Sequence, residues 1–223
     1  MSEREQRKAS LQPFVDCFGR SIEEVLNDLE QFCVTLEKWQ RMQNLVSRET
    51  LGAVWERHIL DSLQILPLMH DHLAANSAST LVDIGSGGGF PALPLAIALK
   101  GSPITLHMVE SRSRKCAFLK AVVRESGLSA HVHTSRIEDV DRTKLEPIHA
   151  MTARALAPLP LLFGYLEHFW TQDITKAYLH KGREYGEELR QADSVWRSSV
   201  INHPSTVDPQ GVILEVSSLE RIA

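Results

Sequence analysis

Apolar residues in the first part of the chain recur at helical spacing. Between Ser21 and Trp39 they fall three and four positions apart, which places them on one face of a helix. Ser21 and Glu24 form a capping-box pattern at its start. A second helix is expected from about Glu49 to Leu66, because the following Pro67 discourages continuation.

The pattern changes to alternating strands and helices after residue 77. The candidate strands are Thr80–Ile84, Ile104–Val109, Ala130–Thr134, Ala150–Ala153, Ala177–His180 and a late pair near Val200 and at Gly211–Val216. This alternation predicts a mostly parallel sheet with helices on both faces. The last two strands have no helix between them, so they are expected to form an antiparallel hairpin at one edge. We therefore predict an α/β domain with a seven-stranded sheet in residues 78–223 and a helical N-terminal extension in residues 1–77.

A glycine-rich segment directly follows the first candidate strand. Residues 81–90 read LVDIGSGGGF, and residues 91–99 are rich in the Ala and Leu of a helix. Glycines at such a turn accept positive φ and let a ligand approach the backbone, while the helix N-terminus offers free N–H groups. A tight turn without a ligand is the alternative. A nucleotide-cofactor loop is favoured, because glycine-rich turns after a first strand are typically binding sites.

The spacing of the glycines indicates which cofactor binds. A dinucleotide fingerprint requires G-x-G-x-x-G or a final Ala, but here Phe90 occupies that last position. Gly85, Gly87 and Gly89 instead form G-x-G-x-G. Preceded by the acid Asp83, this pattern resembles the first motif of S-adenosylmethionine-dependent methyltransferases.

A second acid supports a nucleotide-like cofactor. Glu110 ends the second candidate strand, where nucleotide-binding folds place a carboxylate on ribose hydroxyls. An acid at a strand end is otherwise often only solvated. The glycine loop and Glu110 together are a stronger indication than either alone.

Composition limits the other classes of function. The 223-residue chain has no stretch of about 20 apolar residues, and its start is polar and charged, so we expect a cytosolic protein without a membrane segment. Three widely spaced cysteines, and His131 and His133 without accompanying ligands, give no reason to expect a metal. The net charge of −4 argues against coating nucleic acid by bulk electrostatics. Basic residues in 112–124 and 176–183 form either solvated surface or a local basic face.

Several segments in order resemble the RsmG (GidB) family of methyltransferases, which act on guanine N7 of small-subunit (16S) ribosomal RNA. They are Trp39 with Asn44–Ser47, Arg57–Ser62, the glycine loop, Ser135–Glu138, Thr152–Ala155 and Tyr178–Gly182. The resemblance covers roughly residues 36–182. It implies a class I, Rossmann-like methyltransferase fold, S-adenosylmethionine as cofactor, and ribosomal RNA in the small subunit or its precursor as partner.

The resemblance also assigns residues to the site. Cofactor contacts would fall on Gly85, Phe90, Glu110, Ile137, Glu138 and Arg154, beside the motif residues Asp83, Gly87 and Gly89. Polar positions around the cofactor and RNA cleft would be Asn44, Arg57, His58, Arg136 and Lys181. The family loop often has Pro where this chain has Gly88, and Gly where it has Ala92. These departures bear on loop rigidity rather than on cofactor identity.

Methylation at N7 requires no proton transfer by the protein. Guanine N7 carries an in-plane lone pair and no proton, so no catalytic base is expected and the enzyme works by positioning and excluding water. We expect Arg154 to frame the cofactor cleft and Lys181 to contact RNA. His58 alternatively forms only a surface pair with Asp61. A small-molecule methyltransferase and a non-catalytic cofactor-binding module of ribosome assembly remain the alternative functions.

Overall fold

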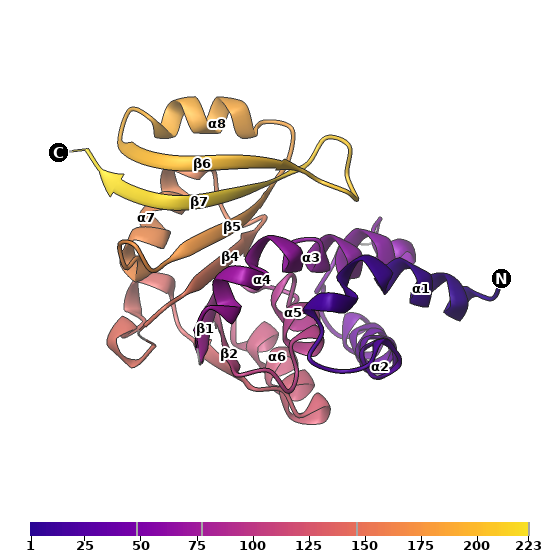
Figure 1. The fold of residues 1–223 in the computed structure, drawn as a ribbon. Helices are drawn as coiled ribbons and strands as arrows, with labels where there is room; N and C mark the ends of the chain where they lie inside the picture. Colours follow the sequence, from indigo (N-terminus) through magenta and orange to yellow (C-terminus); the bar gives the residue numbers. More distant parts are fainter. Residues whose placement is uncertain (48, 77, 146, 223) are drawn as a thin grey trace.

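A seven-stranded sheet forms the centre of the computed structural model, which describes residues 1–47, 49–76, 78–145 and 147–222 (Figure 1). The strands are β1 (Ser79–Ile84), β2 (Ile104–Glu110), β3 (Ala130–Thr134), β4 (Ala150–Arg154), β5 (Lys176–Lys181), β6 (Trp196–Pro204) and β7 (Val212–Arg221). Their order in the sheet is β3-β2-β1-β4-β5-β7-β6. Only β7 runs antiparallel to its neighbours β5 and β6. The predicted seven-stranded sheet and its edge hairpin are confirmed.

Helices cover both faces of the sheet. One face packs against α5 (Ala92–Ala98) and α6 (Ser113–Ser126), and the other against α7 (Leu159–Phe169) with α8 (Tyr185–Ala192) beside it. Figure 1 places α7 and α8 on the side of the sheet away from the N-terminal helices. The central strands β1, β4 and β5 are buried on both sides, whereas β3 and β6 expose many of their residues.

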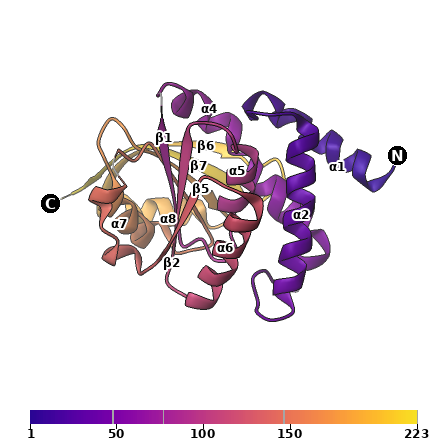
Figure 2. The ribbon, with the colours of Figure 1, turned by 90° about the horizontal axis from the view of Figure 1, so that it is seen from below.

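The N-terminal helices add a further layer over α5 and α6. They are α1 (Glu3–Leu11), a 3₁₀ turn at Gln12–Cys17 and α2 (Ile22–Gln40). Figure 2 shows α2 lying outside α5 and α6. The predicted capping box is present, since Ser21 Oγ accepts from Glu24 N at 3.4 Å and the Glu24 carboxylate accepts from Ser21 N at 3.0 Å. The apolar face of α2 is buried, and Phe32 packs against Phe90.

The second predicted helix is wrong in its extent. Instead of one helix over residues 49–66, the structure has a 3₁₀ turn (Leu51–Ala53), a π-helical turn (Trp55–Leu60) and the short α3 (Asp61–Leu63). A separate helix, α4 (Leu66–Ala74), then begins with Pro67 in its first turn, where a missing N–H costs nothing. Pro67 therefore starts a helix rather than ending one.

The order of the parallel strands reverses between β1 and β4. Strands β2 and β3 lie on one side of this point, and β5 lies on the other. Open α/β sheets bind ligands outside the carboxyl ends of the strands at such a switch point. The predicted division after Ser77 falls at a residue outside the described ranges and stays a prediction. Residues before and after it share one buried cluster, from Leu11 to Ile213.

Candidate active site

The glycine loop closes β1 at the switch point. Gly85, Gly87 and Gly89 have φ of 70°, 55° and 87°, a region that residues with a Cβ rarely adopt. A Cβ on Gly85 would also come within 2.5 Å of Leu156. Backbone N–H groups of Gly85 and Ser86 donate to the carbonyl of Val109 at 2.9 and 3.1 Å. The loop is thereby fixed to the end of β2.

Glu110 holds the loop from the neighbouring strand. It ends β2, and its Oε2 accepts from Gly87 N at 2.9 Å while its Oε1 accepts from Arg112 N at 2.7 Å. Each carboxylate oxygen has a further lone pair. Glu110 therefore restrains both turns and still presents acceptor capacity to the space above them.

A cavity of about 510 Å³ lies over this loop. We call it the first cavity. The predicted site residues in its lining are Gly85, Gly87, Phe90, Glu110, Ile137, Glu138, Arg154, His58 and Arg136. Their chemistry fits S-adenosylmethionine, with a carboxylate for the ribose, a buried Ile137 for the adenine face and glycine backbone for the methionine part. Whether each of them contacts the cofactor stays a prediction.

Two predicted cofactor residues lie beneath the loop and not in the cavity lining. Asp83 is buried, its Oδ1 accepts from Thr152 Oγ1 at 2.6 Å, and its Oδ2 has no partner among the described residues. Burial raises the pKa of Asp83 to about 7. Gly89 is buried where a Cβ would come within 2.3 Å of Leu93 on α5. Both positions support the loop from below, and their part in cofactor binding stays a prediction.

Three predicted cleft residues also lie outside the first cavity. Asn44 is exposed and lines another hollow, beside Arg114. Arg57 is exposed, and its backbone carbonyl accepts from Arg154. Lys181 is 11% exposed and pairs with Glu188 at 2.5 Å. These three residues therefore do not line the first cavity, and their predicted places around the RNA cleft stay predictions.

Lys181 borders a second cavity of about 330 Å³, which adjoins the first. Arg154, Ala155 and Leu156 line both cavities and form the wall between them. Ala155 has a φ of 50°, an uncommon value for a residue with a Cβ. Lys181 Nζ donates to the carbonyl of Ala157 at 3.1 Å, so β5 supports this wall from behind.

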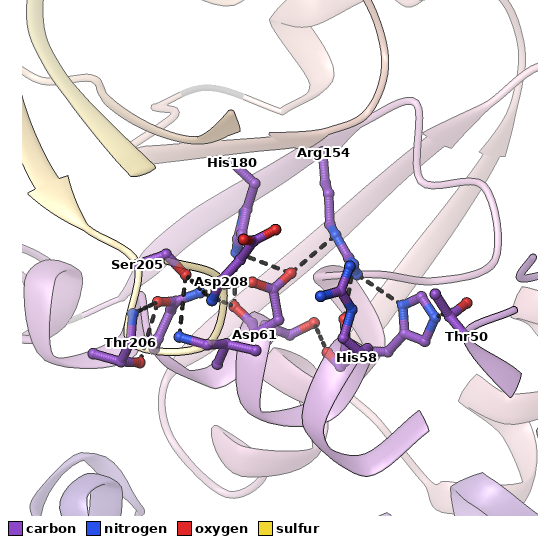
Figure 3. Close-up of polar contacts among 12 residues, drawn as sticks. Thr50, His58, Asp61, Arg154, His180, Ser205, Thr206 and Asp208 are labelled. Carbon is purple, nitrogen blue, oxygen red and sulfur yellow. Dashed lines mark hydrogen bonds and ion pairs between the residues drawn. The ribbon is translucent and has the colours of Figure 1, made fainter. Parts of the chain in front are cut away.

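Arg154 is the centre of a polar network between β4 and the helical part (Figure 3). Its Nε donates to Asp61 Oδ2 at 3.0 Å, its Nη1 to His58 Nδ1 at 3.0 Å and its Nη2 to the Arg57 carbonyl at 2.8 Å. Because a guanidinium only donates, His58 Nδ1 accepts and His58 Nε2–H donates to Thr50 Oγ1 at 2.8 Å. Burial, and then the charges of Arg154 and Arg57, lower the pKa of His58 to about 4. His58 is therefore neutral at pH 7.

Asp61 is a site residue that the sequence reasoning missed. The alternative of a surface pair is wrong, because His58 and Asp61 are both buried and each contacts Arg154. The sequence signal that could have pointed to both residues is the segment Arg57–Ser62 itself. It places basic and acidic side chains on either side of the apolar pair Ile59 and Leu60. Lys115 and Leu156 line the first cavity and were not predicted either.

Comparison with known proteins connects this geometry to a family. Residues 25–212 match the model of the GidB family, described as rRNA small subunit methyltransferase G. The chain belongs to the GidB family. It is therefore a methyltransferase, and its methyl donor is S-adenosylmethionine.

Named relatives of this GidB-family chain match almost its full length. It is 39% identical to ribosomal RNA small subunit methyltransferase G of Chelativorans sp. strain BNC1, over 89% of this chain and 91% of the relative. It is 40% identical to the protein of that name in Rhizobium meliloti, with the same shares of both chains. The protein of that name in Brucella ovis is 39% identical over 95% of each chain.

Solved structures show the same fold at low sequence identity. The O-methyltransferase TomG from Streptomyces achromogenes, in complex with S-adenosylmethionine, matches with a TM-score of 0.54 at 15% identity, over 98% of this chain and 100% of TomG. A fibrillarin/Nop5p complex matches with a TM-score of 0.51 at 10% identity, over 63% of this chain and 73% of that one. The predicted class I methyltransferase fold with a helical N-terminal region is confirmed.

Proposed function

We propose that this chain methylates N7 of one guanine in small-subunit ribosomal RNA, and that it acts in the cytoplasm on the small subunit or its precursor. The observation that carries the proposal is the first cavity in a member of the GidB family. One hollow brings the glycine loop, Glu110, Ile137 and Arg154 together from four separate segments. Its relatives are named for methylation of this RNA.

The chain's own residues act by binding and positioning. The glycine loop and Glu110 hold the cofactor, and Arg154, fixed by Asp61 and His58, keeps the wall between the two cavities in place. Held by these residues, S-adenosylmethionine would supply an electrophilic methyl group for the lone pair of N7, with the C–S bonding pair remaining on sulfur. No proton moves, so the site needs no base and no residue is assigned as one.

The basic residues favour RNA over a small-molecule acceptor. Arg112, Lys115 and Arg136 line the first cavity, and Lys181 and Arg183 line the second. The two basic segments of the sequence thus contribute to adjoining cavities at one edge of the sheet. A small-molecule site has no use for such a rim, whereas a phosphate backbone is held by it.

Among the described residues, no three His, Cys, Asp or Glu side chains gather as metal ligands do. No helix in the described ranges is long and apolar enough to cross a membrane. Neither finding bears on the methyl-transfer proposal itself.

Methyl transfer from radiolabelled S-adenosylmethionine tests the proposal. The acceptors are small subunits from cells that lack the enzyme, the naked rRNA prepared from them, and large-subunit RNA as control. We expect label in small-subunit RNA, released as 7-methylguanine at a single position by mass spectrometry. Cofactor binding without label in any RNA would indicate the non-catalytic module instead. Label only in a small molecule from a cell extract would indicate the other alternative.

A further inference from the structure

The second cavity shares part of its lining with the first. It adjoins the first cavity across Arg154, Ala155 and Leu156, and Leu162 and Ile213 add apolar surface to its lining. The turn between β6 and β7 contributes Ser205 and Asp208 to the same lining. Its walls therefore combine apolar side chains, against which a base can pack, with polar groups.

We propose that the second cavity receives the acceptor guanine, and that Asp208 selects guanine by accepting hydrogen bonds from its N1–H and 2-amino group. This inference rests on the proposed function, because it places the base of that reaction. Guanine N7 and O6 lie on one edge of the ring, and the N1–H and 2-amino donors lie away from N7. With N7 at the wall shared with the first cavity, those donors point toward the far end.

Asp208 is the acidic residue that we assign to these donors. Its Oδ1 accepts from Gln210 N at 3.0 Å, while its Oδ2 has no partner among the residues that the structure describes. Backbone N of Asp208 donates to Ser205 Oγ at 3.0 Å, which fixes the turn. Thr206 N in the same turn donates to Gln64 Oε1 at 2.9 Å and ties it to the helical part.

The other acids in the lining are engaged or exposed. Asp61 accepts from Arg154 Nε and from Gln64 Nε2. Glu188 pairs with Lys181 and accepts from Leu159 N at 2.8 Å. Glu184 lies exposed at the start of α8. Asp208 alone combines partial burial, a restrained backbone and a carboxylate oxygen without a partner within the described ranges.

His180 supplies an independent observation. Its Nε2–H donates to the Asp61 carbonyl at 2.7 Å, so its Nδ1 carries a lone pair. The side chain is 7% exposed, and Nδ1 has no partner among the described residues. Figure 3 shows His180 and Asp208 on the same side of Asp61, away from Arg154. The end of the cavity that faces the guanine donors therefore offers acceptors, whereas adenine would bring its own N1 acceptor there.

Inosine tests this arrangement, because it keeps N7, O6 and N1–H but lacks the 2-amino group. The methylated guanine is first mapped with the wild-type enzyme, and small-subunit RNA carrying inosine at that position is prepared by ligation. We expect the wild-type kcat/KM to be roughly tenfold or more lower for inosine than for guanine. In Asp208→Asn, kcat/KM for guanine should fall by a similar factor and the guanine-to-inosine ratio should approach one.

Two controls isolate the effect. Asp173→Asn changes an exposed acid just before the amino end of β5, whereas the second cavity lies at the carboxyl ends of the parallel strands. This variant should keep the wild-type ratio. The dissociation constant of S-adenosylmethionine should stay within about twofold in Asp208→Asn, because Asp208 does not line the first cavity.

The outcomes separate this inference from the function beneath it. A wild-type enzyme that methylates no small-subunit RNA overturns the proposed function. One that methylates guanine and inosine equally well overturns the inference alone, whether or not the variant folds. The inference also fails if Asp208→Asn keeps the wild-type ratio, or if Glu184→Gln abolishes it instead.

Discussion

Arg154 at the end of β4 and Asp61 in the helical part form an ion pair with 3.0 Å between Nε and Oδ2. Their side chains are 21% and 13% exposed, so both charges are largely removed from water. The pair joins the wall of both cavities to a segment that lies far away in the sequence. The position of this wall is therefore coupled to the packing of the helical part.

Removal of the Asp61 charge should be costly. Asp61→Asn leaves the largely buried guanidinium of Arg154 without its counter-charge, and we expect the free energy of unfolding to fall by about 3 kcal/mol. Urea unfolding at constant m-value measures the change. The control is Glu167→Gln, which breaks the exposed pair with Arg221 and should cost about 1 kcal/mol or less. Equal losses in both variants would contradict the role given to Asp61.

Glu110 should contribute to cofactor affinity through the loop that it holds. In Glu110→Gln the amide nitrogen cannot accept from Gly87 N or Arg112 N, so one of the two bonds is lost. We expect the dissociation constant of S-adenosylmethionine to rise about tenfold or more, as measured by calorimetry. Glu125→Gln, an exposed change at the end of α6, should leave it unchanged. Unaltered affinity in Glu110→Gln would show that the carboxylate is not needed.

Gly85→Ala should damage the loop in two ways. The new Cβ strains a φ of 70° and crowds Leu156, which moves the wall between the cavities. Gly101→Ala shares the strain, with a φ of 91°, but its Cβ meets nothing within 4 Å. Both variants should lose about 1–2 kcal/mol of stability. Only Gly85→Ala should also lose cofactor affinity by more than about tenfold, so a matching loss in Gly101→Ala would count against crowding as the cause.

Asp83 should make the fold less stable as the pH rises. Its pKa is raised from 3.8 to about 7 by burial, so between these values the folded state holds a proton that the unfolded chain has released. Stability then falls with rising pH, by at most about 1.4 kcal/mol per unit. Asp83→Asn removes this term, and its stability relative to wild type should improve from pH 5 to pH 7. Parallel pH profiles by urea unfolding would refute the assignment.

His58 should have the opposite dependence. Its pKa is lowered from 6.5 to about 4, so between these values the unfolded chain binds a proton that the folded state does not. Stability is therefore lost as the pH falls from 6.5 toward 4, again by at most about 1.4 kcal/mol per unit. His58→Gln should flatten this part of the profile, measured by thermal or urea unfolding. His70→Gln, at an exposed position on α4, should retain the wild-type slope.

Local patterns predicted the parts of the fold that local forces determine. The capping box at Ser21 and the strand before Gly85 involve residues close in sequence, and both are present. The strand ends at Glu110 and Arg154 could be placed together because parallel strands present their carboxyl ends at one edge.

The errors come from interactions between distant residues. The apolar spacing over residues 49–66 predicted one helix, but the structure breaks it into 3₁₀ and π-helical turns. These turns are stabilised by tertiary packing, which a periodic pattern does not contain. The role of Asp61 depends on its ion pair with Arg154, which is distant in the sequence. Asn44 and Lys181 line hollows other than the first cavity. Tertiary partners of this kind leave no mark in the spacing of a single sequence.

The hydrogen bond from Thr206 to Gln64 joins two segments that lie far apart in the sequence. Strand β7 and α3 both border the second cavity, and β7 is held in the sheet by its antiparallel pairing with β5. Local unfolding of the β6–β7 hairpin would therefore open the second cavity, while the glycine loop keeps its hydrogen bonds to Val109 and Glu110 on β2.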